Sequence, residues 1–385
     1  MSRAPGRLLG HHAIRSLVFE RVLLTGAALL AVAALVSGRV APRDVPQLLD
    51  LRLLSLFLVL TIAVELGKAS DLFDRLVVAV ATRVRSARGL AGGMLAVSGA
   101  LAAILTNDVA LFLVIPFTMR FRRVGDLDLA PIVVLEVAAA NVLGCISPIG
   151  NPQNLFLYTR GSFSPESFFR AQIPWCAGAG VLLAAVLPLL VPRRVLAAPR
   201  VEPFDLDPLR AGACVALLLG EVLSLFGVLD HRIPLLLAVG GAVLLGRRLI
   251  DTDFSLVLVF ALLFVGVAGL ERGRLYEAVD PVRIFGHRAR GLVLSGALLS
   301  QFVSNVPAAM LLAPAASGTA AFRGLLYGVN AGGCGTPISR SRTSSAPSSS
   351  SGRAAWPRSS GGASFRPRRS CSFCSRRSPF CSSRE

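Results

Sequence analysis

Long apolar windows, separated by short polar or basic segments, run along most of the chain. Seven of them carry few charges and are long enough to cross a hydrocarbon core of about 30 Å. They are residues 22–37, 53–66, 130–145, 172–191, 210–228, 233–245 and 255–270. The pattern predicts a series of membrane-spanning helices.

Two further apolar stretches are interrupted by polar residues near their middle. Residues 89–117 contain LTND at 105–108, and residues 291–316 contain VSNVP at 303–307. Each stretch is too long for one simple crossing, so each predicts a helix, a polar break and a second helix.

Composition agrees with a membrane protein of the all-α class. Hydrophobic residues make up 54% of the 385 residues, charged residues 16%, and the mean hydropathy is +0.65, far more apolar than a soluble domain of this length. The first window follows a long basic leader and no small-residue cleavage site follows it, so we expect an uncleaved first span rather than a signal peptide.

The formal net charge of +18 raises the question of nucleic acid as a partner. Residues 339–385 hold ten arginines and one glutamate and supply half of this charge. The other basic residues gather at the ends of apolar segments, as cytoplasmic anchors do. We therefore expect no nucleic acid partner, a cytoplasmic N-terminus, and a first interrupted stretch that enters and leaves on the cytoplasmic side as a re-entrant hairpin.

The chain also repeats itself. In the first half, VSGALAAILTND (97–108) precedes EVAAANVLGCISPIGNPQN (136–154). In the second half, LSGALLSQFVSNVP (294–307) precedes LLYGVNAGGCGTPI (325–338). The spacing from Asn141 to Pro148 equals that from Asn330 to Pro337. We infer two inverted repeats, each with a re-entrant helical hairpin and a broken transmembrane helix, a layout found in secondary transporters.

The breaks are where chemistry is expected. Backbone that leaves a helix inside a bilayer exposes N–H and C=O groups, which protein, water or a bound solute must satisfy. Open carbonyls can coordinate a cation, and helix N-termini attract an anion. The alternative is that proline and glycine only kink packed helices while the asparagines join neighbours. The candidate substrate- or ion-binding residues are Thr106, Asn107, Asp108, Asn141, Ser147, Asn151, Asn154, Ser304, Asn305, Asn330 and Thr336.

Carboxylates inside apolar segments need a partner, a cation or a proton. Asp108 and Glu136 fit this description and are candidate proton carriers. Glu65 and Glu221 lie nearer segment ends, where we expect interfacial positions. No metal site is expected, because the CSFC motif at 371–374 lacks matching ligands.

The motifs at the breaks resemble those of the ion transporter superfamily of inner-membrane anion permeases. The resemblance rests on ILTNDVALFLVIPFT (104–118), SPIGNPQNLFLY (147–158), SQFVSNVPAAMLL (300–312) and VNAGGCGTP (329–337), and it covers residues 53–338. That superfamily includes ArsB-type arsenite pump subunits, NhaD-type sodium/proton antiporters, citrate-metal symporters and divalent-anion/sodium symporters. The resemblance implies a multi-pass protein of the bacterial inner membrane.

In the divalent-anion symporters, hairpin tips of Ser-Asn-Thr type help to bind sodium and the substrate carboxylate. By position this role would fall on Thr106, Asn107 and Asp108 and on Ser304, Asn305 and Val306. Asp108 and Val306 depart from the pattern, and an aspartate at that position could carry a proton.

The expected function is secondary active transport of a small inorganic or organic anion, coupled to H⁺ or Na⁺, by alternating access. A sodium/proton antiporter is the alternative. No GxxxxGK[ST] loop is present, so we expect this chain itself to use no ATP, and an ion gradient or a separate ATPase partner, as in some arsenite pumps, to drive transport. No other cofactor is expected. No enzymatic activity is expected either, because the four histidines fall at or near segment ends and form no catalytic constellation. The expected partners are a small anionic solute and membrane lipid, and a homodimer is left open.

The sequence changes character abruptly after Ile338, where SRSRTSSAPSSSS begins. Skipping two nucleotides there would permit an apolar continuation of the second broken helix, so we hypothesise that residues 339–385 are an out-of-frame translation. The alternatives are a genuine disordered tail or a basic membrane-surface anchor. The expected organisation is a leader and first span (1–50), repeat 1 (51–200), connecting helices (201–250), an incomplete repeat 2 (251–338) and this tail.

Overall fold

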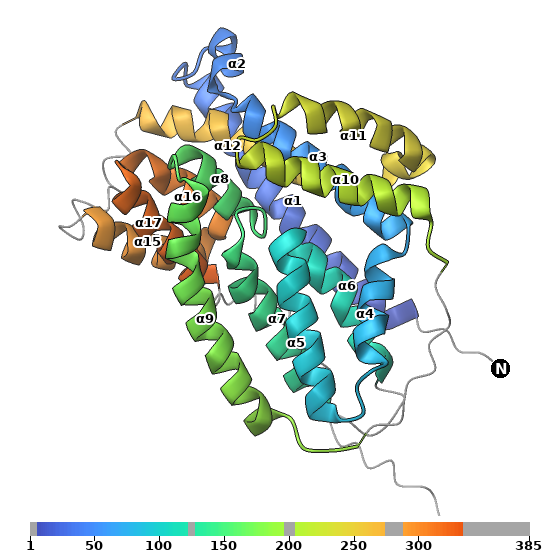
Figure 1. Ribbon diagram of the computed structural model, residues 1–385. Coiled ribbons are helices and arrows are strands. Elements are labelled where there is room, and N and C mark those ends of the chain that lie inside the picture. The colour runs from blue at the N-terminus through green and yellow to red at the C-terminus, as the bar shows by residue number, and fades with distance from the viewer. Residues whose placement is uncertain (1–5, 122–127, 196–204, 274–287, 334–385) are drawn as a thin grey trace, which may run out of the picture. The chain divides into compact units, whose positions relative to one another are not determined.

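The computed structural model describes residues 6–121, 128–195, 205–273 and 288–333. The chain divides into two units, Met1–Ala346 and Pro347–Glu385, and all of the described residues belong to the first. They form α-helices joined by turns and short 3-10 segments, with no β-strand among them (Figure 1). The predicted all-α class is therefore confirmed.

Each of the seven apolar windows coincides with a helix. These helices are α1 (Gly6–Val36), α3 (Leu51–Ala69), α7 (Ala130–Leu143), α9 (Pro165–Leu190), α10 (Pro208–Leu225), α11 (Arg232–Leu245) and α12 (Ser255–Glu271). A ten-residue helix, α4 (Leu72–Ala81), was not predicted because it is too short to register as a span.

Several helices have the length and composition of membrane spans. Within the described residues, four qualify by themselves: Ala87–Ile104, Pro165–Leu190, Pro208–Leu225 and Arg232–Asp251. The last joins α11 to the 3-10 segment η4 (Gly246–Asp251). A fifth is reached if Pro42–Leu48, which contains η1 (Pro42–Asp44) and α2 (Val45–Leu48), is joined to α3 across a bend of 66°. The chain is a multi-pass membrane protein by this criterion.

Both interrupted stretches consist of two helices separated at the predicted break. The first forms α5 (Ala87–Ile104) and α6 (Asn107–Arg120), and the second forms α15 (Arg288–Val303) and α16 (Asn305–Leu312), followed by η5 (Ala313–Ala315). In each pair the two helices pack against one another. With 14 and 8 residues, α6 and α16 are shorter than the ~20 residues of a span. Re-entry and inverted duplication stay predictions.

The first broken helix has the predicted form. After α7, the 3-10 segment η3 (Gly144–Ile146) and the loop at residues 147–151 lead into α8 (Pro152–Arg160). The corresponding helix of the second half is α17 (Thr319–Gly333). Its predicted break at residues 335–338 lies outside the described residues.

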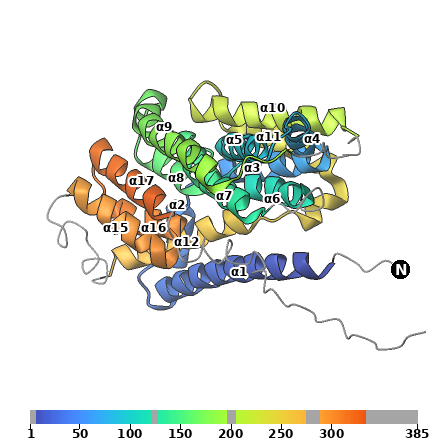
Figure 2. The same cartoon turned by 90° about the horizontal axis from the view of Figure 1, so that it is seen from below.

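The helices pack in local groups that bring distant segments together. Helices α3, α10 and α11 lie side by side, as do α5, α6 and α7, while α15 and α16 pack with α17 (Figure 1). Helix α1 runs along α12 (Figure 2). An aromatic cluster joins α3, α8 and α12: the ring centroid of Phe260 lies 4.4 Å from that of Phe57 and 6.3 Å from that of Phe156.

Glycines four residues apart bring α17 unusually close to α15. A Cβ added to Gly324 would lie 2.4 Å from the Ala289 carbonyl oxygen, and one added to Gly328 would lie 2.5 Å from the Val293 carbonyl oxygen. This spacing places both glycines on one helix face, so the two backbones can approach as they do in small-residue membrane interfaces.

Candidate functional site

The tip of the first hairpin has an unusual backbone. Thr106 is buried and connects α5 to α6 with φ 144° and ψ 155°, a region that only glycine visits freely. Its Oγ1 accepts a weak hydrogen bond from the Val109 N–H at 3.5 Å and so caps α6. A strained residue of this kind persists only where the surrounding structure fixes it.

Asn107 connects this tip to the broken helix. Its backbone N–H donates to the Gly150 carbonyl at 3.1 Å, and its Nδ2 donates to Asn141 Oδ1 at 3.0 Å. Asn141 in turn donates from Nδ2 to the Val137 carbonyl at 2.8 Å. The tip of the first hairpin and the first broken helix are therefore hydrogen-bonded to one another.

The break between α7 and α8 folds back on itself. A Cβ added to Gly150 would lie 2.0 Å from the Gly144 carbonyl oxygen and 2.8 Å from that of Ala102, so only glycine fits. Ser147 Oγ accepts from the Ile149 N–H at 3.2 Å, which tightens the loop.

Two amide side chains fill the inside of this break. Asn154 is fully buried, and its Nδ2 donates to the carbonyls of Cys145 and Ser147 at 3.2 and 3.4 Å. Asn151 Nδ2 lies 3.1 Å from Cys145 Sγ. Asn151 Oδ1 is buried and finds no donor among the described residues. It is one acceptor at the break that could take a ligand.

A pair of amide contacts joins the two halves of the chain. Asn330 on α17 donates from Nδ2 to Asn154 Oδ1 at 2.9 Å, and Gln153 donates from Nε2 to Asn330 Oδ1 at 3.3 Å. All three side chains are buried. Asn154 and Asn330 belong to the predicted set, whereas Gln153 was given no role. Gln153 lies between Pro152 and Asn154 in the SPIGNPQN motif, and this position was the signal that could have found it.

The second hairpin repeats the geometry of the first. Ser304 lies between α15 and α16 with φ 81° and ψ 160°, again in the region that favours glycine. Asn305 follows it at the first position of α16, as Asn107 does in α6. A Cβ added to Gly333 would lie 2.2 Å from Asn305 Nδ2, so this tip contacts the end of α17. Thr336 lies outside the described residues.

The two candidate proton carriers differ in burial. Glu136 is fully buried, its Oε1 accepts a short hydrogen bond from Thr118 Oγ1 of α6, and its Oε2 has no partner among the described residues. Asp108 is exposed at the start of α6, where its backbone N–H donates to Asn107 Oδ1 at 2.9 Å. Because Glu136 is buried and Asp108 is exposed, ionising Glu136 would cost more free energy than ionising Asp108.

Glu65 and Glu221 were both expected at interfacial positions, but the Glu221 side chain does not reach the surface. Glu65 is partly exposed and pairs with Lys68 at 2.6 Å near the end of α3. Glu221, in contrast, is fully buried in α10. Leu217 and Gly220, on the same face, contact α11, and the Ser224 carbonyl contacts Arg52 of α3. Two neighbouring helices cover this face, which position along the chain did not show.

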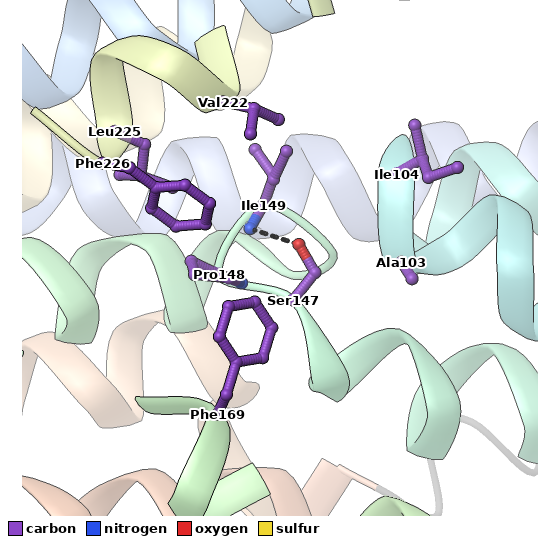
Figure 3. Close-up of a pocket in the computed structure, with 9 residues that line it drawn as sticks. All are labelled: Ala103, Ile104, Ser147, Pro148, Ile149, Phe169, Val222, Leu225 and Phe226. Atoms are coloured by element: carbon purple, nitrogen blue, oxygen red, sulfur yellow. Dashed lines mark hydrogen bonds between the residues drawn. The ribbon is translucent and has the colours of Figure 1, made fainter. Parts of the chain in front are cut away.

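A cavity of about 210 Å³ borders the first-half breaks (Figure 3). The loop residues Ser147, Pro148 and Ile149 form one part of its lining, and the end of α5 forms another. The figure shows α10 closing the cavity from above the loop, with Phe169 of α9 below it. Its lining residues are Ala103, Ile104, Ser147, Pro148, Ile149, Phe169, Val222, Leu225 and Phe226.

In the described part of the chain, no three residues of the types His, Cys, Asp and Glu gather. The polar groups at the candidate site are side-chain amides, hydroxyls, and backbone N–H and C=O groups that lack helical hydrogen bonds at the breaks. Such groups can bind a small solute or an alkali cation without a resident cofactor.

A sequence-family model described as Citrate transporter matches residues 16–339. The match covers most of the chain and includes both hairpin tips and the α7–α8 break. The chain belongs to the citrate transporter family. It is accordingly a membrane transporter and not an enzyme. The match ends one residue after Ile338, where the Ser/Arg-rich segment begins.

Relatives in other organisms agree with this assignment. The chain is 29% identical over 277 residues to the inner membrane protein YbiR of Escherichia coli, covering 71% of this chain and 73% of that protein. It is 32% identical over 248 residues to an uncharacterized transporter of Methanocaldococcus jannaschii, covering 62% and 64%. A silicon efflux transporter of Oryza sativa is 27% identical over 163 residues, covering 42% and 34%.

Proposed function

We propose that this family member is a secondary active transporter that moves a small inorganic or organic anion, coupled to H⁺ or Na⁺, by alternating access. The substrate binds at the breaks of both halves, and movement of one half against the other exposes it alternately to the two sides of the membrane. The family's description as a citrate transporter makes citrate the first substrate to test.

The observation that carries this proposal is the contact between Asn154 and Asn330. It joins the broken segments of the two halves at 2.9 Å inside the protein. The hairpin tips reach the same region, because Asn107 binds the loop before α8 and Asn305 contacts the end of α17. A site shared by two halves is what alternating access requires.

An anion is favoured by the helix ends at these breaks. The N-termini of α6, α8 and α16 begin directly at the breaks, at Asn107, Pro152 and Asn305. Helix N-termini carry partial positive charge and free N–H groups, so they stabilise a carboxylate or an inorganic oxyanion. The half-helices of other transporters bind anionic substrate groups in this way.

Sodium/proton antiport is the second candidate, and specific atoms favour it. Asn151 Oδ1 and Glu136 Oε2 are buried oxygens that lack donors among the described residues. Buried oxygens without donors are ligands for a cation or a proton. The same atoms could bind the coupling ion of an anion symporter, so the two functions differ in whether an anion moves.

The test is transport by the purified chain in proteoliposomes. We expect radiolabelled citrate to accumulate when a pH or sodium gradient is imposed, in the 385-residue chain or, if residues 339–385 are out of frame, in the protein with that frame restored. Asn330→Ala should abolish this accumulation because it removes the link between the halves. The matched control is Thr159→Ala, because Thr159 lies on α8 and bonds only its own helix, to the carbonyls of Leu155 and Phe156 at 3.1 and 3.0 Å.

Two other outcomes would overturn the anion proposal. If no citrate, phosphate or sulfate moves but sodium collapses an imposed pH gradient, the chain is an antiporter. If neither flux exceeds that of empty vesicles, both for the 385-residue chain and for the protein with its frame restored, the protein does not perform secondary transport.

Location and partners follow from the same proposal. Large apolar side chains on α9 and α11 are exposed, among them Val181, Leu189, Leu236 and Val243, and membrane lipid is the partner that would cover them. We place the chain in a bacterial inner membrane with its N-terminus in the cytoplasm, and a homodimer stays open.

A further inference from the structure

Glu221 is a buried carboxyl that the proposed site does not use. It is fully buried in α10, and neither of its oxygens has a hydrogen-bond partner among the described residues. One turn further on, Ser224 is also buried and its Oγ has no described partner. An ionised carboxylate without a donor is costly in an apolar interior, so this environment accommodates the neutral acid.

Among the described residues, no basic side chain forms a hydrogen bond with Glu221. Arg52 of α3 contacts the same turn of α10, where its Nη2 reaches the Ser224 carbonyl at 3.5 Å. The other charged residues on α3, α9 and α10 form ion pairs: Glu65 with Lys68, Glu166 with Arg170, and Arg210 with Asp207. On α11 the charged residue is Arg232, at the first position of the helix.

The turn that carries Glu221 forms a wall of the cavity beside the substrate site. Val222, Leu225 and Phe226 line that cavity opposite the α7–α8 loop (Figure 3). Glu221 directly precedes Val222 and lies one helical turn before Leu225. Glu221 itself does not line the cavity, because its face of α10 packs against α3 and α11. A movement that separates this end of α10 from those helices as well as from the loop would bring water to Glu221.

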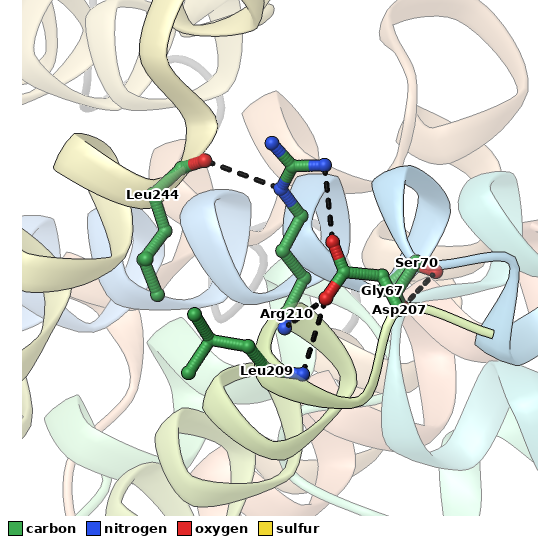
Figure 4. A network of polar contacts seen from close by, with 6 residues as sticks. All are labelled: Gly67, Ser70, Asp207, Leu209, Arg210 and Leu244. Carbon is green, nitrogen blue, oxygen red and sulfur yellow. Dashed lines mark hydrogen bonds and ion pairs between the residues drawn. The ribbon is translucent and has the colours of Figure 1, made fainter.

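The opposite end of α10 is held in place (Figure 4). Asp207 Oδ1 accepts from the N–H groups of Leu209 and Arg210, both at 3.1 Å, and its own N–H donates to the Ser70 carbonyl at 3.3 Å. Arg210 pairs with Asp207 at 3.2 Å and donates from Nε to the Leu244 carbonyl at 3.2 Å. These bonds tie the start of α10 to α3 and α11.

We propose that Glu221 is a proton-binding site of the transport cycle. It holds a proton in the conformation described here and releases that proton to water when this end of α10 moves away from its neighbours. The inference rests on the proposed secondary transport and deepens it, because it makes H⁺ a coupling ion and assigns the carrier to a connecting helix outside both repeats.

The first test measures protonation directly, without transport. In infrared spectra of the purified chain in lipid vesicles near neutral pH, we expect a carbonyl band of a protonated carboxyl that is absent from Glu221→Gln. The variant keeps the size and neutrality of the acid, and circular dichroism will show whether its helices are retained. Glu65→Gln is the matched control, since Glu65 already has Lys68 as a partner. A spectrum of Glu221→Gln identical to that of the wild type would overturn the proposal.

A second measurement needs no variant. Dicyclohexylcarbodiimide adds to protonated carboxyls in apolar surroundings and leaves a stable N-acylurea, which mass spectrometry locates. We expect the wild-type peptide containing Glu221 to be labelled, with labelling that falls as the pH rises. A Glu221 peptide that stays unlabelled at every pH, while other carboxyls react, would contradict the proposal.

Vesicle experiments separate this inference from the proposed function. With citrate as the probe and a pH dye inside, we expect Glu221→Gln to retain citrate exchange while citrate-driven proton entry is lost. Citrate exchange with unchanged proton entry in the variant would refute the role of Glu221 alone. Failure of the wild type to move any anion would refute the proposed function, while the protonation measurements would still decide whether Glu221 holds a proton.

Discussion

Two single residues, Thr106 and Ser304, carry the strain of the hairpin breaks. Each is a non-glycine residue at positive φ, and each directly precedes an asparagine that begins the next helix. Such a backbone conformation costs about 1–3 kcal/mol, and residues that adopt it cluster at functional sites. The equivalence of the two positions is what an internal duplication predicts.

At Ser304, glycine should relieve strain. Ser304 makes no side-chain cap, so Ser304→Gly removes a backbone cost of about 1–3 kcal/mol and adds about 0.5–1 kcal/mol of chain entropy. We expect the glycine variant to unfold at a higher temperature in detergent than Ser304→Ala, which keeps the strain. An alanine variant as stable as the glycine variant would show that Ser304 is not strained.

Thr118 provides a second test at the scale of one residue, because it donates the hydrogen bond found at Glu136. Thr118→Val has nearly the same shape but leaves both carboxyl oxygens of Glu136 unpaired, so we expect a loss of about 1–3 kcal/mol in the free energy of unfolding. Thr118→Ser keeps the hydroxyl and should lose about 0.8 kcal/mol, for one methyl group. Equal losses in the two variants would mean that the hydrogen bond contributes nothing.

At the scale of elements, the packing of α17 on α15 decides how the second half holds its site. Asn330, which bonds Asn154, lies on α17 two residues after Gly328. The glycine face of α17 fixes the distance of this helix from α15, and thereby the position of the amide that reaches the first half.

Gly328→Ala should therefore disrupt more than one contact. The new Cβ would meet backbone oxygen 2.5 Å away, which a side-chain rotation cannot relieve, so we expect a destabilisation of about 1–3 kcal/mol and weaker citrate transport. Gly178→Ala on α9 is the control, since nothing lies within 4 Å of its added Cβ. There we expect a gain of about 0.5–1 kcal/mol. Thermal unfolding in detergent compares the two, and equal tolerance would contradict the close packing.

At the scale of the whole molecule, the chain has two halves of unequal length. The first half contains a hairpin and both sides of a broken helix, whereas the family match ends at residue 339, just after the second break begins. If residues 339–385 are out of frame, one wall of the shared site is missing. Residues 339–385 lie outside the described residues, and the frameshift stays a prediction.

Resequencing the gene across codons 330 to 385 tests the frameshift hypothesis. We expect an open apolar frame beginning near codon 338, and we expect the protein with that frame restored to accumulate citrate faster than the 385-residue chain. Early stop codons in the skipped frame would make the basic tail genuine. Robust transport by the 385-residue chain would show that the tail does not disrupt the site.

The sequence alone predicted most of the helices and the breaks between them, while the binding roles of the residues at those breaks stay predictions. Helices α5 and α6 separate at the predicted LTND break because polar residues interrupt an apolar run, a signal that is local along the chain. All six asparagines of the chain lie at the hairpin tips or in the two broken-helix segments, so side-chain chemistry marked the site before any fold was known.

Only the tertiary structure decided which of these residues meet and which carboxyls are buried. The bond from Asn330 to Asn154 and the contact of Asn107 with Gly150 join segments whose distance in space no local pattern encodes. Position along α10 predicted an interface for Glu221, but α3 and α11 bury it. Burial is a property of neighbouring helices, so it emerges only when they pack.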